Sequence, residues 1–263
     1  MSQPRSSSDA YSHIVVTRED AIATITMNRP ERRNALSMAH IEELIDALGA
    51  VAKSDARVVI IAANGPVFCA GHDYGDMVER DLDGFRELFA RCAEMMNLVQ
   101  SIPQPVVASV QGIATGAGCQ LVATCDLAVA SEAASFATPG GKGGWFCSTP
   151  MVAVSRAIGR KRALEMLLTG DPIDARTAAE WGLVNRVVPA ARLREETEKL
   201  AHAASRGSTA SKATGKHAFY EQIDLDQAEA YTFASEVMST SAVAPDGREA
   251  IASFFEKRKP VYR

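Results

Sequence analysis

The sequence predicts an α/β protein, with a β/α core and a largely parallel sheet followed by a helical C-terminal region. Short apolar runs typical of strands alternate with amphipathic helical patterns through the first half of the chain. Several of these runs are continuously apolar, as expected for strands that are covered on both faces. Strand, helix, strand in this order implies right-handed crossovers and parallel pairing. After about residue 148 helical patterns dominate.

The predicted core begins with a hairpin and continues as alternating strands and helices. A turn at Glu19–Asp20 is expected to connect the first strand of the hairpin to the second. From Ile41 onward, apolar residues recur at the spacing of one helix face. The expected strands are 14–17, 22–27, 58–62, 106–110 and 127–130, and the expected helices are 41–51, 82–100 and a short one after a glycine-rich turn at 112–118.

The C-terminal part is expected to be mostly helical, with one strand at 184–188. The chain is therefore divided into a flexible, Ser-rich tail at 1–12, a β/α core at 13–190 and a helical region at 191–263. The expected helices are 150–158, 161–168, 174–181, 190–204, 211–222, 225–238 and 246–257.

Composition excludes several classes of protein. The chain has 263 residues, which is enough to bury a core without disulfides, and its net charge of −4 argues against a nucleic-acid surface. The five cysteines form no CxxC pair, so we expect reduced thiols, a cytoplasmic location and no metal site. The tail lacks the apolar segment of a signal peptide, and no apolar run approaches the roughly 18 residues of a membrane span.

Three segments place small residues directly after predicted strands. Segment A is Phe68–Met77 (FCAGHDYGDM), segment B is Gln111–Gln120 (QGIATGAGCQ) and segment C is Phe136–Thr149 (FATPGGKGGWFCST). Ligands of α/β sheets bind beyond the carboxyl ends of the strands. We therefore expect the three segments to converge on one binding site.

Segment B is expected to present unhindered backbone N–H groups at the start of a helix, where they can hold an anion or a developing oxyanion. Tight packing of helix against strand also requires small residues and is an equal alternative. The sequence contains no P-loop, GxGxxG, GxSxG or HExxH motif. Backbone electrostatics are therefore the main catalytic resource that remains.

Segments A and B resemble the crotonase superfamily, the enoyl-CoA hydratase/isomerase family. Three further stretches share the resemblance: NRPERRNAL at 28–36, LLTGDPIDARTAAEWGLVNRVVP at 167–189 and DGREAIASFFEKRKP at 246–260. The resemblance implies a crotonase-like β/α spiral core with a C-terminal helical region. Segments B and C look most like one branch of the family, the enoyl-CoA hydratase domain-containing protein 3 type.

The resemblance implies four positions at the reacting centre. The backbone N–H groups of His72 and Ala117 would form an oxyanion hole for the thioester oxygen. Hydratases of the family use two glutamates as general acid and base, and here these positions are Gln120 and Gly140. Glutamine cannot exchange a proton near neutral pH, so ordinary hydration is expected to be weak or absent.

The resemblance also implies contacts with coenzyme A, which would enter as part of the substrate, with no separate cofactor. Arg32 and Arg33 match positions beside the nucleotide end, and Ala70 matches a backbone contact to adenine. Lys257 matches a lysine that reaches the coenzyme A of a neighbouring subunit. A homotrimer or a hexamer built from two trimers is implied, with residues 191–263 serving oligomerisation and with no nucleic-acid or membrane partner.

The leading hypothesis is an acyl-CoA enzyme that is hydratase-like and keeps the thioester-polarising N–H pair. Alternatives are a non-catalytic acyl-CoA-binding protein, or an isomerase, thioester hydrolase or decarboxylase on the same scaffold. The His72 ring and the Cys147 thiol are candidates to replace the missing glutamates. For His72 the backbone N–H is the more favoured role, and for Cys147 a buried, inert thiol is favoured.

Overall fold

The computed structural model describes residues 11–262, so most of the predicted tail lies outside the described part. As the sequence predicts, the architecture is α/β with a mostly parallel sheet. Only β1 and β2 of this sheet pair antiparallel, and the other neighbours are parallel. In order across the sheet the strands are β1 (Ile14–Glu19), β2 (Ile22–Met27), β3 (Val58–Ala63), β5 (Val106–Val110), β7 (Leu127–Ser131) and β10 (Arg186–Val188).

A second, smaller sheet was not predicted. Its strands run in the order β4 (Val67–Cys69), β6 (Ile113–Thr115), β8 (Ser135–Ala137) and β9 (Ile173–Asp174). Three of them lie in or directly before segments A, B and C, so the predicted turn at 112–118 contains β6. Strands of two or three residues are too short to show a periodic pattern, and their pairing partners lie far away in the sequence.

Other differences concern element ends. The hairpin turn lies at Asp20 and Ala21, one residue later than predicted, and Asp20 has a positive φ of 48°. Among the helices the largest change is in the C-terminal region, where α10 spans Gln227–Val243 instead of 225–238. Helix ends differ because capping, which depends on local geometry, decides where a helix stops.

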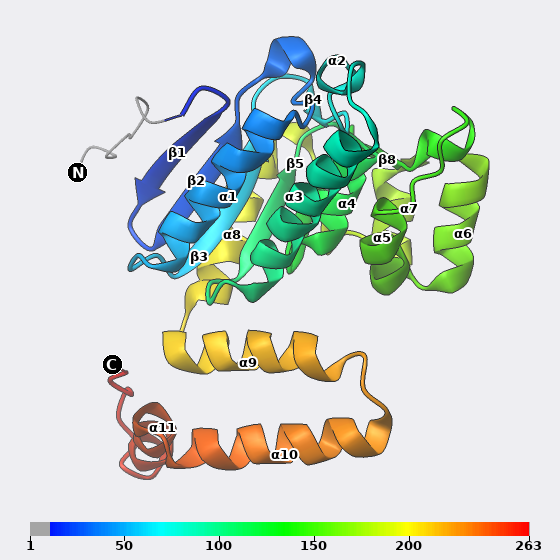
Figure 1. Cartoon of the computed structure of the whole chain (residues 1–263). Coiled ribbons are helices and arrows are strands. Elements are labelled where there is room, and N and C mark those ends of the chain that lie inside the picture. Colours follow the sequence, from blue (N-terminus) through cyan, green and yellow to red (C-terminus); the bar gives the residue numbers. More distant parts are fainter. Residues whose placement is uncertain (1–10, 263) are drawn as a thin grey trace.

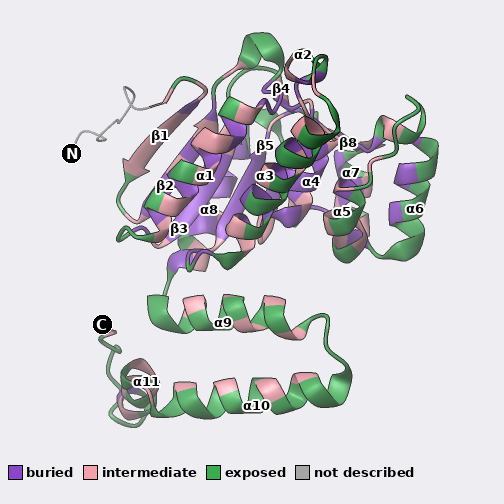
Figure 2. Cartoon of the chain, in the orientation of Figure 1, coloured by how far each residue is buried: buried purple, intermediate pink, exposed green. Residues whose placement is uncertain are grey.

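Helices cover both faces of the large sheet (Figure 1). On one face α1 (Met38–Ala52) and α3 (Leu82–Ser101) pack together, and on the other face α8 (Leu193–Ser205) packs on β3, β5 and β7. Buried residues gather along the sheet between these layers (Figure 2). Helices therefore cover the continuously apolar strands on both faces of the sheet, as the sequence predicts.

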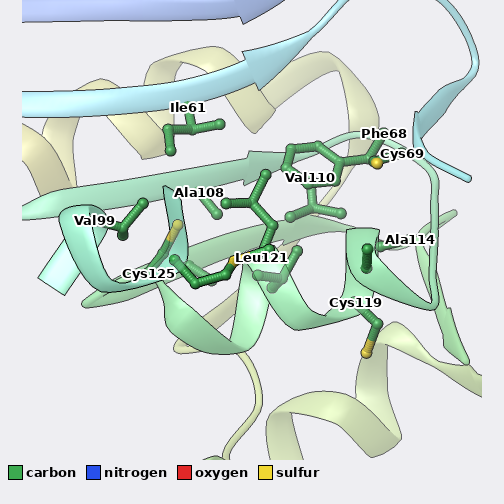
Figure 3. Packing of buried hydrophobic residues seen from close by; sticks show 14 of the residues in the cluster. Ile61, Phe68, Cys69, Val99, Ala108, Val110, Ala114, Cys119, Leu121 and Cys125 are labelled. Carbon is green, nitrogen blue, oxygen red and sulfur yellow. The ribbon is translucent and has the colours of Figure 1, made fainter. Parts of the chain in front are cut away.

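The core continues into the small helix α4 (Ala117–Thr124), which starts in segment B. Leu121 of α4 lies near Val110 and Phe68 in the same buried cluster (Figure 3). This packing joins the two sheets and fixes the position of segment B.

The remaining helices lie in segments A and C and in the C-terminal half. They are α2 (Tyr74–Met77), α5 (Pro150–Ile158), α6 (Arg160–Thr169), α7 (Ala175–Trp181), α9 (Thr209–Gln222), α10 and α11 (Pro245–Phe255), with 3₁₀ turns at Pro30–Arg32, Pro139–Gly141 and Ala190–Arg192.

Helices α9, α10 and α11 form an arm that extends from the core (Figures 1 and 2). Neither α9 nor α10 contains a buried residue, and Ser253 is the one buried residue of α11. The arm is attached where Lys216 of α9 donates to the carbonyls of Val99 (2.8 Å) and Gln104 (2.9 Å) and pairs with Asp126 (2.7 Å). No helix among residues 11–262 has the length and apolar character needed to span a bilayer.

Candidate functional site

The three glycine-containing segments meet at one cavity of about 180 Å³, as the sequence predicts. One side, which we call the amide wall, consists of residues 70–72, Tyr74 and residues 115–117. The other side, the loop wall, consists of residues 139–140 and 145–150. Phe89 of α3 also lines the cavity. Among the described residues, no Asp, Glu, Lys or Arg contributes to the lining.

Close backbone contacts hold the amide wall together. The Thr115 hydroxyl donates to the carbonyl of Ala70 (3.0 Å), which ties segment B to segment A. Gly71 has a positive φ of 90°, and a Cβ there would lie 3.0 Å from the carbonyl oxygen of Thr115 and 3.5 Å from the nitrogen of Ala117. Glycine at this position therefore permits segments A and B to approach each other closely.

The backbone N–H of His72 points away from the neighbouring segment at Leu36, with which His72 forms an isolated bridge. Leu36 donates its N–H to the carbonyl of Gly71 (2.8 Å), and Asp73 donates its N–H to the carbonyl of Leu36 (3.1 Å). In an extended chain, successive N–H groups face opposite sides, so the N–H of His72 between them faces the cavity side.

The backbone N–H of Ala117 is the first of helix α4, where N–H groups have no acceptor within the helix. Gly116 precedes it with φ 54° and ψ −120°, a conformation that glycine adopts without strain. Both His72 and Ala117 line the cavity. The two predicted donors are therefore brought to one space.

The alternative explanation of segment B, tight packing, also holds, but for the next residue. A Cβ at Gly118 would lie 2.2 Å from the carbonyl oxygen of Cys69. The helix therefore lies directly against β4, and only glycine fits between them.

The imidazole ring of His72 is not positioned for proton transfer to a molecule in the cavity. Both ring nitrogens are shielded from solvent and have no hydrogen-bond partner among the described residues, and the ring packs edge-on against Phe89 (5.3 Å between centroids). Burial lowers the pKa of His72 below its ordinary value of 6.5, and the nearby Leu36 carbonyl and Asp76 offset part of this shift. The ring is thus neutral near pH 7.

The loop wall is built around the absence of a side chain at Gly140. The Gly140 carbonyl accepts N–H groups from Gly143 (3.0 Å) and Trp145 (2.9 Å), so the loop folds back over it. A Cβ at Gly140 would lie 2.1 Å from the carbonyl oxygen of Trp145 and 2.8 Å from Sγ of Cys147. A glutamate therefore cannot be restored here without moving the loop.

Gln120 and Cys147, the two other side chains considered for the reacting centre, differ in whether they reach the cavity. Gln120 is 5% exposed and is not among the cavity-lining residues, and its Oε1 has no hydrogen-bond partner in the described part of the chain. Cys147 does line the cavity, and its Sγ accepts the N–H of Gly140 (3.3 Å). Burial raises the pKa of the Cys147 thiol above its ordinary 9.0, which disfavours the nucleophilic thiolate.

The predicted coenzyme A residues divide into two groups. Arg32 and Arg33 are exposed beside the amide wall: the carbonyl of Arg33 accepts the N–H of Ala70 (3.1 Å), and the Arg32 guanidinium reaches the start of α2 near Gly75. Among residues 11–262 neither guanidinium has an ion-pair partner. Lys257 follows α11, which lies at the opposite end of the molecule from α2 (Figure 1), so it does not reach the cavity of its own chain.

Two supporting residues inside or near the recognised motifs were not singled out from the sequence. Asn34 is fully buried; its amide donates to the carbonyls of Asn64 (2.9 Å) and Val67 (2.8 Å) and accepts the N–H of Arg29 (2.8 Å). Arg29 forms a partly buried ion pair with Asp73 (3.2 Å). The cluster of Asn, Arg and Pro residues in the 28–36 motif is the sequence feature that could have indicated these two supporting residues.

A larger cavity of about 480 Å³ lies on the other face of the sheet, where α8 leaves β1 and β2 uncovered. Its lining includes the hydroxyls of Thr17, Thr24 and Thr26 and charges of both signs. Leu193 and Arg194 at the start of α8 also line it, but none of the site residues predicted from the sequence does. The smaller cavity is therefore the candidate site.

Known proteins of similar sequence and structure identify the family. A model of the enoyl-CoA hydratase/isomerase family matches residues 17–263. Enoyl-CoA hydratase domain-containing protein 3 of Mus musculus is 45% identical over 97% of this chain and 86% of its own length. The crystal structure of the human protein of the same name has a TM-score of 0.92 at 44% identity, covering 95% of this chain and 100% of the human one. The 2,3-dehydroadipyl-CoA hydratase of Escherichia coli (strain K12) is 31% identical over 96% of this chain and 99% of its own length.

The expected cytoplasmic location is contradicted by these matches. The similar proteins of Mus musculus, Rattus norvegicus and Homo sapiens are all named mitochondrial. Reduced cysteines are compatible with both the cytoplasm and the mitochondrion, so cysteine usage could not distinguish between these two locations. All five cysteines are free of disulfides in the structure.

Proposed function

The chain belongs to the enoyl-CoA hydratase/isomerase family, and we propose that it binds an acyl-CoA thioester with the thioester oxygen between the N–H groups of His72 and Ala117. One observation supports this proposal: His72 and Ala117, which come from different elements, line the same cavity. Such donors stabilise negative charge on the oxygen as it becomes an enolate, typically by about 3–4 kcal/mol each.

Ordinary hydration is proposed to be weak or absent. The reaction needs a group that activates water and a group that protonates carbon, and together such groups contribute about 10²–10⁴-fold. Gln120 does not reach the lining, and Gly140 has no room for a side chain. No carboxylate replaces them in the described cavity, and the ring nitrogens of His72 are shielded.

The same observations favour a second candidate, an acyl-CoA-binding protein without turnover. An uncharged lining with an intact N–H pair is sufficient for binding a thioester, since hydrogen bonding to the carbonyl does not require proton transfer. The two candidates differ in one step, which is whether the proton on C2 of the acyl group exchanges with solvent.

The coenzyme A portion is proposed to extend from the cavity along Ala70 toward Arg32 and Arg33, whose guanidinium groups suit phosphates. Lys257 is proposed to act on the coenzyme A of a neighbouring subunit in a homotrimer or hexamer. The arm supports this, because it exposes large apolar side chains that isolated chains rarely leave uncovered. These side chains are Phe219, Ile223, Tyr231, Met238, Val243, Ile251, Phe254 and Phe255.

Four measurements on the purified protein test these proposals. Calorimetry with crotonyl-CoA should detect binding, while the absorbance of its conjugated thioester should decay little over the uncatalysed rate. Exchange of the C2 proton of butyryl-CoA in D₂O, followed by mass spectrometry, separates an enolate-forming enzyme from a pure binder. Light scattering should give three or six times the chain mass of 28.1 kDa. Rapid hydration of crotonyl-CoA would overturn the argument about the missing carboxylates.

A further inference from the structure

The cavity has an aromatic side whose residues come from three separate parts of the chain. Phe85 and Phe89 of α3 lie stacked with their centroids 6.0 Å apart, and Trp145 of the loop wall meets them at 5.9 and 5.6 Å. The ring of His72 joins at its edge. Phe89 and Trp145 line the cavity, and Trp145 remains 47% exposed.

This aromatic side lies in the same small space as the N–H pair of the amide wall. A thioester whose oxygen sits between His72 and Ala117 therefore directs its acyl group into a space bordered by Phe89 and Trp145. Aromatic rings prefer edge-to-face or offset contacts with other rings, and a ring in the acyl group can continue the arrangement that is already present.

Charge and volume argue against two kinds of acyl group, those with a second carboxylate and those with a long chain. Since no cationic side chain lines the described cavity, a second carboxylate at the far end of an acyl chain would be buried without a partner. The volume of about 180 Å³ is close to the roughly 150 Å³ of an engineered apolar cavity that binds benzene. A long fatty acyl chain would leave most of its length outside.

We propose that the acyl group carries a single uncharged aromatic ring, and that Phe89 and Trp145 determine this specificity. The inference rests on the proposed function, because it requires a thioester bound at the amide wall. It adds the substrate class, aryl acyl-CoA thioesters, to the binding mode.

Binding of four thioesters tests the proposal: phenylacetyl-CoA, butyryl-CoA, palmitoyl-CoA and adipyl-CoA. Phenylacetyl-CoA should bind about tenfold more tightly than butyryl-CoA, the effect expected for one or two aromatic contacts. Palmitoyl-CoA and adipyl-CoA should bind more weakly than phenylacetyl-CoA. The sequence contains two tryptophans, so in a Trp181→Phe background the fluorescence of Trp145 reports the contact, and phenylacetyl-CoA should change it more than butyryl-CoA does.

Two variants locate the effect. Phe89→Leu and Trp145→Leu keep apolar side chains and remove one ring each; each should weaken phenylacetyl-CoA about fivefold and change butyryl-CoA less than twofold. Trp181→Phe is the matched control and should change neither, because Trp181 does not line the cavity and its ring lies beside Arg162.

Equal affinity for butyryl-CoA and phenylacetyl-CoA, or tighter binding of palmitoyl-CoA, would overturn the proposed substrate class and leave thioester binding intact. Equal weakening of every thioester by the two leucine variants would also overturn it. If none of the four thioesters bound, the proposed function itself would fall, and the aromatic specificity with it.

Discussion

The two sides of the cavity are built from different parts of the polypeptide. The amide wall offers backbone N–H groups on segments that are tied together by hydrogen bonds, such as the one from Thr115 to Ala70. The loop wall could take part in proton transfer only through side chains. Its residue 140 is a glycine, and the surrounding atoms leave no space there for a side chain. Backbone donors persist when side chains change, because every residue except proline carries an N–H. A site that polarises the thioester through backbone groups, as we propose here, can therefore persist while the side chains that transfer protons change.

Removing one backbone donor is expected to have the largest effect. Proline lacks an N–H and is tolerated at the first position of a helix, which Ala117 occupies in α4. Ala117→Pro should slow C2 proton exchange, or any turnover that is found, by about 10²–10³-fold. In the unsubstituted protein the carbonyl stretch of a bound thioester should lie at lower frequency than that of the free thioester. Difference infrared spectroscopy should show that this shift is absent in Ala117→Pro.

Ala117→Gly is the matched control, since it changes the side chain and keeps the N–H. It should retain the carbonyl shift and most of the activity. If Ala117→Pro folded and kept the shift, the amide wall would not be the polarising element.

Substitution in the loop wall is expected to act on stability. At Gly140 even a methyl group would meet the carbonyl of Trp145 at 2.1 Å. Gly140→Ala should therefore lower the free energy of unfolding by about 3 kcal/mol, measured by urea denaturation. Gly143→Ala, where the new Cβ would lie 3.7 Å from its nearest contact, should cost well under half as much.

A double variant with Gln120→Glu and Gly140→Glu should for the same reason gain no hydration of crotonyl-CoA. Substantial gain would show that the loop wall opens easily and that the missing carboxylates alone prevent hydration.

Acid is expected to weaken the support behind the amide wall. His40 is fully buried near Leu36, with Nδ1 3.1 Å from the carbonyl of Ala35, and burial lowers its pKa to about 4. The unfolded chain takes up a proton near pH 6.5 and the folded chain does not, so stability is lost as the pH falls from about 6.5 toward 4. His40 should contribute about 2 kcal/mol of this loss between pH 7 and pH 5.

Urea denaturation of the unsubstituted protein and of His40→Asn at both pH values measures this contribution. The variant should lose about 2 kcal/mol less between the two. An unchanged pH dependence in His40→Asn would mean that other groups cause the acid sensitivity.

The smallest effect is expected at Cys147 in the loop wall. Burial raises the pKa of this thiol above 9.0, so it stays protonated near pH 7 and reacts slowly. Cys147→Ser keeps an acceptor for the N–H of Gly140 and should change thioester affinity less than twofold. Loss of a measurable turnover in this variant, with binding intact, would make Cys147 a nucleophile.

Much of the molecule was predictable from local sequence. Continuous apolar runs such as Val58–Ala63 gave the strands of the large sheet, and helical spacing gave α1 and α3. The family and its branch, read from ordered motifs, are confirmed. The location of the cavity also followed, because glycine turns after parallel strands gather at one edge of a sheet.

What the sequence by itself determined is therefore the family, the α/β architecture and the segments that converge. The tertiary structure decided the small second sheet, the tight space at Gly140, the shielded ring of His72 and the meeting of Phe89 with Trp145. Each of these depends on contacts between residues that are distant along the chain. Periodicity and motif spacing describe only neighbours in sequence, whereas a clash, a shielded nitrogen or a ring pair exists only after the chain has packed.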